Sequence, residues 1–206
     1  MGNLGTRRTK TSRTGIAVLL AAALLSACTS LVPAPLPNTY DITAPATFPG
    51  LKAGTRAQVL ILEPAAVKVL DSQDIVIKPS DEVVEYLGKS QWSDRLPKLI
   101  QARLIESFEN TGKARAVAKP GDGLVIDYQI VSSIREFQAN LEGSNEAAVS
   151  ISVKLVSDRS GKVVRSEIFT ANVPLSSTEP LAVVSALNRA FAQVARDIVQ
   201  WTLRAV

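Results

Sequence analysis

Few residues of this chain could carry chemistry. The sequence of 206 residues contains no histidine and a single cysteine, Cys28. Without histidine, the chain lacks the commonest general base, the Ser-His triads and the usual imidazole ligands of zinc. The Ser-x-x-Lys and Gly-x-Ser-x-Gly arrangements that surround a nucleophilic serine are also missing from the sequence. Catalysis would therefore have to rest on carboxylates.

The carboxylate pairs do not form a catalytic arrangement. Glu82 and Glu85 fall on opposite faces of a predicted strand, whereas Glu106 and Glu109 lie together on the solvated surface of a predicted helix. Asp122 sits between two glycines in a turn, where aspartate is common for backbone reasons. We therefore predict no catalytic residue, no metal site and no cofactor, and we expect that the protein is not an enzyme.

The lone cysteine closes a segment with the order of a bacterial secretion signal. Basic residues come first, an apolar run follows over 16–25, and Leu25-Ser26-Ala27-Cys28 ends the segment. A membrane-spanning helix needs about 20 apolar residues, so this run is too short to be one. The ending resembles the lipobox of bacterial lipoproteins, whose signal is removed just before the cysteine that receives acyl chains. This resemblance implies a signal peptide over 1–27 and a covalent lipid on Cys28.

The positive charge of the chain belongs to its first segment. Four of the 23 Lys and Arg residues precede Cys28 and no Asp or Glu does, which leaves 19 basic and 19 acidic residues after it. A neutral mature chain gives no reason to expect nucleic acid as a partner. In Gram-negative lipoproteins, an Asp after the lipidated cysteine usually retains the protein in the inner membrane. Thr29 stands there, which favours the outer membrane, with the protein facing the periplasm.

Prolines predict a tether after the lipidated cysteine. Over 28–50 the prolines interrupt any helix or central strand, namely Pro33, Pro35, Pro37, Pro45 and Pro49. An extended segment of this kind spans about 3 Å per residue. We therefore expect one folded domain over 51–206, held at a distance from the bilayer.

The hydrophobic pattern of this domain predicts about seven strands. A continuous apolar run over 58–62 suits a buried strand, the segments 75–77 and 83–86 form a hairpin, and the strand over 114–119 is short. Apolar residues alternate from Leu124 to Ile134 and again over 147–155, and a turn at 158–161 leads to a strand over 163–173.

Two helices complete the prediction. The first has Ser93 as its N-cap, Pro97 in its first turn and Gly112 at its end. The second starts at Ser177 or Thr178, and its apolar residues recur every three or four positions up to Trp201. This stripe indicates either a helix that covers the sheet of its own domain, which we favour, or a coiled coil between subunits. We predict an α/β fold in an α+β arrangement: a single mixed, mostly antiparallel sheet flanked by two helices.

Trp92 stands at the junction of the hairpin and the first helix, and two roles are open for it. Tryptophan is enriched at protein interfaces, so Trp92 is a candidate partner-binding residue. It could equally close the start of the helix against the core. The pattern also allows a cavity for an acyl chain between helices and sheet, although nothing requires one.

Several segments together resemble a known family. After the lipobox and the proline-rich segment come Thr39-Tyr40-Asp41-Ile42, Ile75-Val76-Ile77-Lys78, Glu82-Val83-Val84-Glu85-Tyr86, the run from Gln91-Trp92-Ser93-Asp94 to Gln101, and Leu187-Asn188-Arg189-Ala190-Phe191. The chain resembles the ABC-type transport auxiliary lipoproteins, the PqiC-like family, over nearly the whole mature length. The segment from Trp92 into the helix is the most specific part of the resemblance.

The resemblance implies a function and partners. Such lipoproteins accompany MCE-domain proteins and an ABC transporter that moves lipids between two membranes, and they are thought to dock onto the MCE assembly, with a homo-oligomeric ring as one arrangement. The alternative is a periplasmic carrier that binds phospholipid in its own acyl cavity. An enzyme has the least support from the residues.

Overall fold

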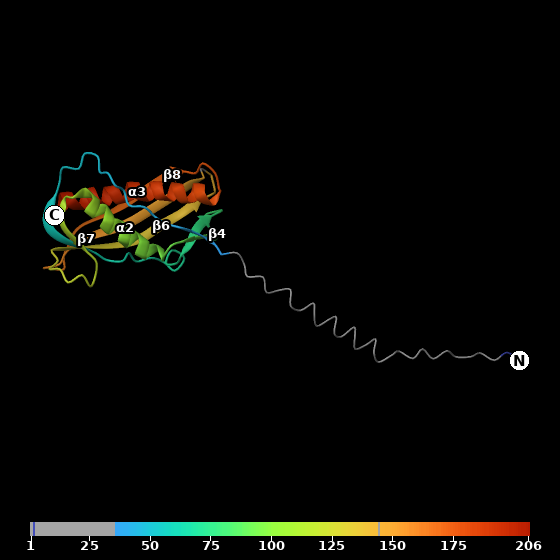
Figure 1. Cartoon of the computed structure of the whole chain (residues 1–206), viewed down its shortest axis with the longest axis horizontal. Helices are drawn as coiled ribbons and strands as arrows, with labels where there is room; N and C mark the ends of the chain where they lie inside the picture. The colour runs from blue at the N-terminus through green and yellow to red at the C-terminus, as the bar shows by residue number, and fades with distance from the viewer. Residues whose placement is uncertain (1, 3–35, 144) are drawn as a thin grey trace. The chain divides into compact units, whose positions relative to one another are not determined.

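The central feature of the fold is one eight-stranded sheet covered on one face by two helices (Figure 1). A computed structural model describes Gly2, residues 36–143 and residues 145–206. The elements are, in chain order, β1 (Asn38–Tyr40), β2 (Thr55–Ile61), β3 (Asp74–Lys78), β4 (Glu85–Trp92), α2 (Leu96–Thr111), β5 (Ala114–Ala118), β6 (Tyr128–Asn140), β7 (Glu146–Ser157), β8 (Val163–Pro174) and α3 (Pro180–Ala205). The predicted mixed sheet with two helices is confirmed.

Strand β6 organises the sheet. One edge of β6 pairs antiparallel with β7 over its whole length, and β7 pairs antiparallel with β8. Two strands share the other edge: β2 runs parallel to the start of β6 at 128–130, and β3 runs parallel to its end at 138–140. The long ladders are thus antiparallel, whereas the pairings β1–β4, β2–β5, β2–β6 and β3–β6 are short and parallel.

The two helices begin without the caps that the sequence suggested. Arg95 and Glu179 occupy the N-cap positions of α2 and α3, and neither makes a side-chain capping hydrogen bond. Ser93 is not the cap of α2, because its hydroxyl donates a hydrogen bond to Asp41 instead. The helix end at Gly112 is confirmed: its φ of 58° is the left-handed conformation that glycine adopts at low cost.

Helix α3 covers the sheet of its own domain, which confirms the interpretation that we favoured over a coiled coil. Its apolar stripe is buried against β6, β7 and β8, and Trp201 in its last turns meets Phe169 of β8 edge to face at 5.6 Å between ring centroids. Within the described residues, no helix is both long and apolar enough to cross a membrane.

Three aromatic rings join the sheet to the helices in the core. Phe137 of β6 lies between Trp92, at 5.8 Å with the rings nearly perpendicular, and Phe191 of α3, at 6.2 Å. All three side chains are fully buried. The whole core cluster lies between Ile42 and Leu203, so residues 36–206 contain all that the described domain needs to fold.

The structure moves the start of the domain toward the N-terminus. The compact unit starts at Pro37, not at residue 51, and residues 37–50, predicted as part of the tether, lie against the helices. Strand β1 pairs with β4, and backbone carbonyls of Pro45 and Thr47 accept hydrogen bonds from Asn110 and Arg196. Side chains of the helices thus satisfy carbonyl groups of a proline-rich segment that has few ladder hydrogen bonds of its own.

Arg103 of α2 holds the start of this segment. Its guanidinium donates to Asp41 and to Glu106, both at 2.7 Å, and to the carbonyl oxygen of Ile42. Burial lowers the pKa of Arg103, but the hydrogen bonds and charges of Glu106 and Asp41 outweigh it, so the pKa lies above its ordinary value. One side chain therefore bridges the N-terminal segment and α2.

Three strand boundaries also differ from prediction. The hairpin exists, but Val83 and Val84 belong to its exposed loop and β4 begins at Glu85. Strand β6 begins at Tyr128 rather than at Leu124, because residues 124–126 form a loop before it. Strand β1 was not predicted, and it raises the count from about seven strands to eight.

Removing the central indole should destabilise the domain. Replacing Trp92 by Ala leaves a void beside Phe137 and should lower the free energy of unfolding by about 3–5 kcal/mol. Urea denaturation of residues 36–206 measures this change. Tyr86→Ala is the matched control, because Tyr86 is half exposed, and its effect should stay within about 0.5 kcal/mol. Equal effects of the two substitutions would contradict the packing described.

Removing the Arg103 bridge should release residues 37–50 without unfolding the sheet. The variant Arg103→Gln loses its hydrogen bonds to Asp41 and Glu106, a local cost of about 1–3 kcal/mol. Hydrogen exchange should then accelerate at Thr43, whose amide donates to Asn188 at 2.9 Å, and stay unchanged in β7. Arg204→Gln, which removes an exposed arginine at the other end of α3, should leave Thr43 unchanged.

Candidate functional site

The residues with the strongest sequence signal lie outside the described part of the chain. The predicted signal peptide over 1–27 and the lipidated Cys28 are not among the described residues, nor is the tether up to residue 35. The continuous described chain starts at Leu36, which is 92% exposed. Because β1 runs parallel to β4 from this point, the chain enters the domain at the end of the sheet where β6 finishes and β7 begins.

Trp92 is placed in the core, which agrees with the second of its two predicted roles. Only 1% of its surface is exposed, and its ring packs on Phe137 rather than toward solvent. Any part that Trp92 plays in partner binding would act through the surface residues that it supports. The structure therefore moves the search for a contact surface away from this side chain.

The surface beside Trp92 carries a group of ion pairs at the start of α2. Arg95 pairs with both Asp71 and Glu63, and the hydrogen bond that its guanidinium donates to Asp71 raises the pKa of Arg95 above its usual value, against a smaller effect of desolvation. The backbone N–H of Arg95 donates to Asp94 at 2.7 Å, and this hydrogen bond lowers the pKa of the Asp94 carboxyl. Asp94 in turn pairs with Lys98 at 3.4 Å, so each of these charged groups has a partner, and the group positions the helix start rather than offering a free binding group.

The predicted carboxylate pairs are dispersed or already partnered. Glu106 is bound by Arg103, and Asp122 accepts a hydrogen bond from the backbone N–H of Lys119 at 2.9 Å, in keeping with its predicted turn role. Glu82 lies in the exposed hairpin loop before β4, so it does not share a strand with Glu85. Of these residues, Glu106 and Asp122 thus have structural partners.

Within the described part of the chain, no strand pairs with the outer side of β8, which leaves a free sheet edge of twelve residues. The other outer strands, β1 and β5, have only three and five residues. Exposed apolar side chains follow the β8 edge: Val163 is 54% exposed, Val164 45% and Ile168 52%. A long edge strand with apolar side chains offers both backbone hydrogen bonds and contact area to another strand. We define Val163, Val164 and Ile168 with their strand as the β8 edge.

The face of the sheet opposite the helices adjoins this edge. Phe169 points toward Trp201 of α3, so its neighbours Ile168 and Thr170 point away from the helices. Thr170 meets Ser150 of β7 at 3.0 Å, and Ile168 lies opposite Ser152. These pairs place small polar side chains on the open face of β7 beside Ile168 of the β8 edge.

Sequence reasoning identified β8 as a strand but not as the long exposed edge. The apolar residues of 163–173 look much like those of β7, since both strands read as alternating segments. Only the pairing of β7 with β6 on its other side distinguishes the buried strand from the edge strand. One sequence signal existed: β7 carries a single charged residue between its ends, Lys154, whereas β8 carries Arg165 and Glu167, as edge strands do.

Relatives of this chain share its sequence and its fold. An uncharacterized protein of Bradyrhizobium diazoefficiens, bll6063, is 35% identical over 168 residues, which are 82% of this chain and 45% of that protein. The chain thus spans about half the length of this curated relative. The crystal structure of protein XCC0632 from Xanthomonas campestris superposes with a TM-score of 0.75 at 27% identity, over 82% of this chain and 96% of that one.

A more distant solved structure supports the fold alone. The protein CT253 from Chlamydia trachomatis is 10% identical, with a TM-score of 0.52 over 73% of this chain and 98% of its own.

A match to a family model shows the family: residues 40–199 fit the model of the ABC-type transport auxiliary lipoprotein component. That match runs from the end of β1 almost to the end of α3. The chain therefore belongs to the family of ABC-type transport auxiliary lipoproteins.

Proposed function

We propose that this protein is an outer-membrane lipoprotein that docks the periplasmic MCE-domain assembly of an ABC-type lipid transport system. Membership of the family supports a role beside such a transporter. The observation that carries the docking role is the β8 edge, because a twelve-residue unpaired strand with exposed Val and Ile side chains fits a partner strand. The partner in this proposal is the MCE-domain protein, and the transporter subunits supply the energy.

The filling of the core favours docking over the alternative of a lipid carrier. An acyl cavity would have to lie between the helices and the sheet, where Trp92, Phe137 and Phe191 pack against one another. The hollows described at the surface of residues 36–206 open to solvent and are lined by mixed polar and apolar side chains. A carrier would instead need an enclosed apolar pocket, since acyl chains are costly to expose to water.

Anchoring by Cys28 completes the proposed role. A lipidated N-terminus would enter the domain through Leu36, at the end of the sheet that is opposite the C-terminus of α3 (Figure 1). Domain and membrane would then be joined only by the residues before β1, which leaves the β8 edge accessible to a periplasmic partner. A ring of several copies, which the family resemblance raised, remains a prediction of this proposal.

Disrupting the β8 edge should abolish partner recovery. Ile168→Lys places a charge on the edge strand and should lower the recovery of an MCE-domain protein by at least about tenfold, since charges on edge strands oppose strand addition. The measurement is mass spectrometry of proteins and lipids that co-purify with the tagged full-length chain from gently solubilised envelopes. Leu181→Lys is the matched control, because Leu181 is an exposed apolar residue of α3 away from the edge.

The outcomes of this pull-down separate the functions. Loss with Ile168→Lys and retention with Leu181→Lys supports docking through the β8 edge. Unchanged recovery with Ile168→Lys contradicts that surface, and recovery of stoichiometric phospholipid without any MCE-domain protein replaces docking by the carrier function.

Removing the cysteine should release the protein from the membrane. Each buried CH₂ group of an acyl chain contributes about 0.8 kcal/mol, and stable anchoring takes more than one chain. With Cys28→Ala placed behind a secretory signal that is cleaved without lipidation, we expect the protein in the soluble periplasmic fraction, whereas the natural sequence should sediment with outer membranes. Retention of the Cys28→Ala protein in the membrane fraction would show that another segment anchors it.

A further inference from the structure

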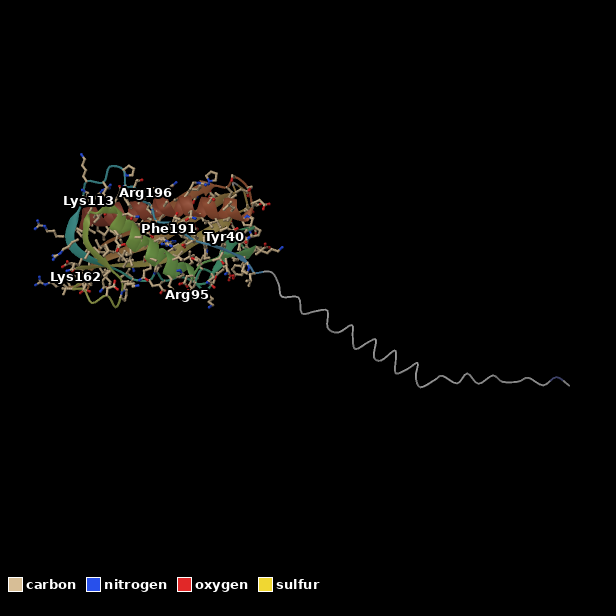
Figure 2. All side chains as sticks on the ribbon, viewed as in Figure 1. Tyr40, Arg95, Lys113, Lys162, Phe191 and Arg196 are labelled. Carbon is tan, nitrogen blue, oxygen red and sulfur yellow. The ribbon has the colours of Figure 1, made fainter. Side chains whose placement is uncertain are left out.

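Although basic and acidic residues are equal in number after Cys28, they are concentrated at opposite ends of the sheet. Basic side chains gather at the end where β2, β5 and β6 begin, namely Arg56, Lys113, Arg115, Arg159, Lys162 and Arg204. Acidic side chains gather at the opposite end, near Leu36, namely Asp81, Glu82, Glu85, Glu142, Glu146 and Glu179. Figure 2 shows Lys113 and Lys162 at the far end of the domain from Tyr40. We call the first of these the basic end.

A hollow of about 530 Å³ lies at the basic end. Arg56 of β2, Arg115 of β5 and Arg159 of the β7–β8 turn line it together. The parallel register of β2 and β5 sets Arg56 beside Arg115, because Thr55 lies opposite Ala114 and Gln58 opposite Ala116. Three chain segments distant in sequence therefore bring three guanidiniums to one concave surface.

These three guanidiniums are available to a ligand. Among residues 36–143 and 145–206, none of them forms an ion pair with a carboxylate. Asp127 also lines the hollow, where its carboxylate accepts the backbone N–H of Gln58 at 2.8 Å, so the three arginines share the hollow with one aspartate. Asp158, next to Arg159, accepts a hydrogen bond from the side chain of Gln129. Like charges brought into one hollow repel one another, and a bound anion would relieve that repulsion.

The chemistry of the lining suits phosphate. Guanidinium groups bind phosphate oxygens through paired N–H donors, and Tyr128 and Ser157 add hydroxyl groups to the same wall. Ala57 and Ile126 contribute apolar surface beside these donors. The volume falls within the range of about 300–1,000 Å³ that is typical of small-ligand sites. A concave site with donors and apolar walls accommodates a phosphate that is attached to a larger molecule.

We propose that Arg56, Arg115 and Arg159 form a binding site for the phosphate of a lipid headgroup. Free inorganic phosphate offers the same oxygens to these arginines. The choice of a lipid as the source of the phosphate rests on the proposed role in lipid transport. The site deepens that role, because it adds a point of contact with the transported molecule to a domain whose core has no room for acyl chains. It does not depend on the β8 edge, which belongs to another surface.

The test uses residues 36–206, which hold the whole core, so that the lipid anchor does not itself bind the vesicles. The first probe is inorganic phosphate, followed through the NMR signals of the arginine side chains. The second is co-flotation with vesicles of phosphatidylethanolamine and phosphatidylglycerol in equal parts. The variant Arg56→Gln/Arg115→Gln/Arg159→Gln is compared with Arg135→Gln/Lys68→Gln/Lys89→Gln, which removes the same charge from exposed positions outside both the hollow and the β8 edge.

The site predicts phosphate-dependent shifts of the three arginine signals and co-flotation that excess phosphate reverses. The first variant should lose vesicle binding by at least about tenfold, whereas the second should lose less than about twofold. Equal losses in both variants would overturn the site in favour of diffuse charge attraction. Phosphate binding without vesicle binding would overturn the lipid source.

A third result would show that the hollow binds a protein rather than a lipid headgroup. If the first variant kept vesicle binding but lost the MCE-domain protein in the pull-down, the hollow would receive an acidic protein surface and the headgroup proposal would fail. Thermal unfolding of both variants shows whether they fold, and the phosphate titration of the natural sequence needs no variant. Because the pull-down with the natural sequence retains all three arginines, a failure of docking is observed separately from a failure of this site.

Discussion

The rest of the structure depends on one edge of β6, with which two different strands pair. Two separate strands, β2 and β3, pair with that edge at its two ends; β5 lies beyond β2, and β4 and then β1 lie beyond β3. Between them, Ala65 bridges to Ser133, so the middle of the edge is closed by a loop. The ladder to β7 holds the other edge over its full length. This arrangement separates the basic end from the chain entry and leaves β8 as the long outer strand.

Local patterns predicted the elements whose structure is decided locally. The alternation of apolar and polar residues predicted β7, the apolar stripe predicted α3 and its contact with the sheet, and Gly112 predicted the end of α2. Strand β1 escaped prediction because three residues in a proline-rich segment carry almost no periodicity, and their partner β4 lies fifty residues away. The cap at Ser93 was wrong because Asp41, brought close by β1, competes for its hydroxyl group.

The functional surfaces were less accessible to sequence reasoning than the fold. Position in the sheet decides which of two similar strands is exposed, and that position is a property of pairings between distant segments. A total charge of zero likewise gave no indication of its separation along the sheet, since β2, β5 and the β7–β8 turn meet only after folding. Trp92 shows the same limit, because residue type alone left open whether it anchors a partner or closes the core, and only the folded structure places it in the core.

The direction of β1 has a mechanical consequence. A force applied to Leu36 along the chain pulls β1 parallel to its own axis, so its hydrogen bonds to β4 are loaded in shear and share the load. Next along the chain, Arg103 of α2 donates hydrogen bonds to Asp41 and to the carbonyl oxygen of Ile42, and Asn188 of α3 accepts one from the amide of Thr43. The force on this segment is therefore shared by two helices rather than carried by a single strand. The domain can therefore resist a pull on its N-terminal side before the strands of the sheet separate.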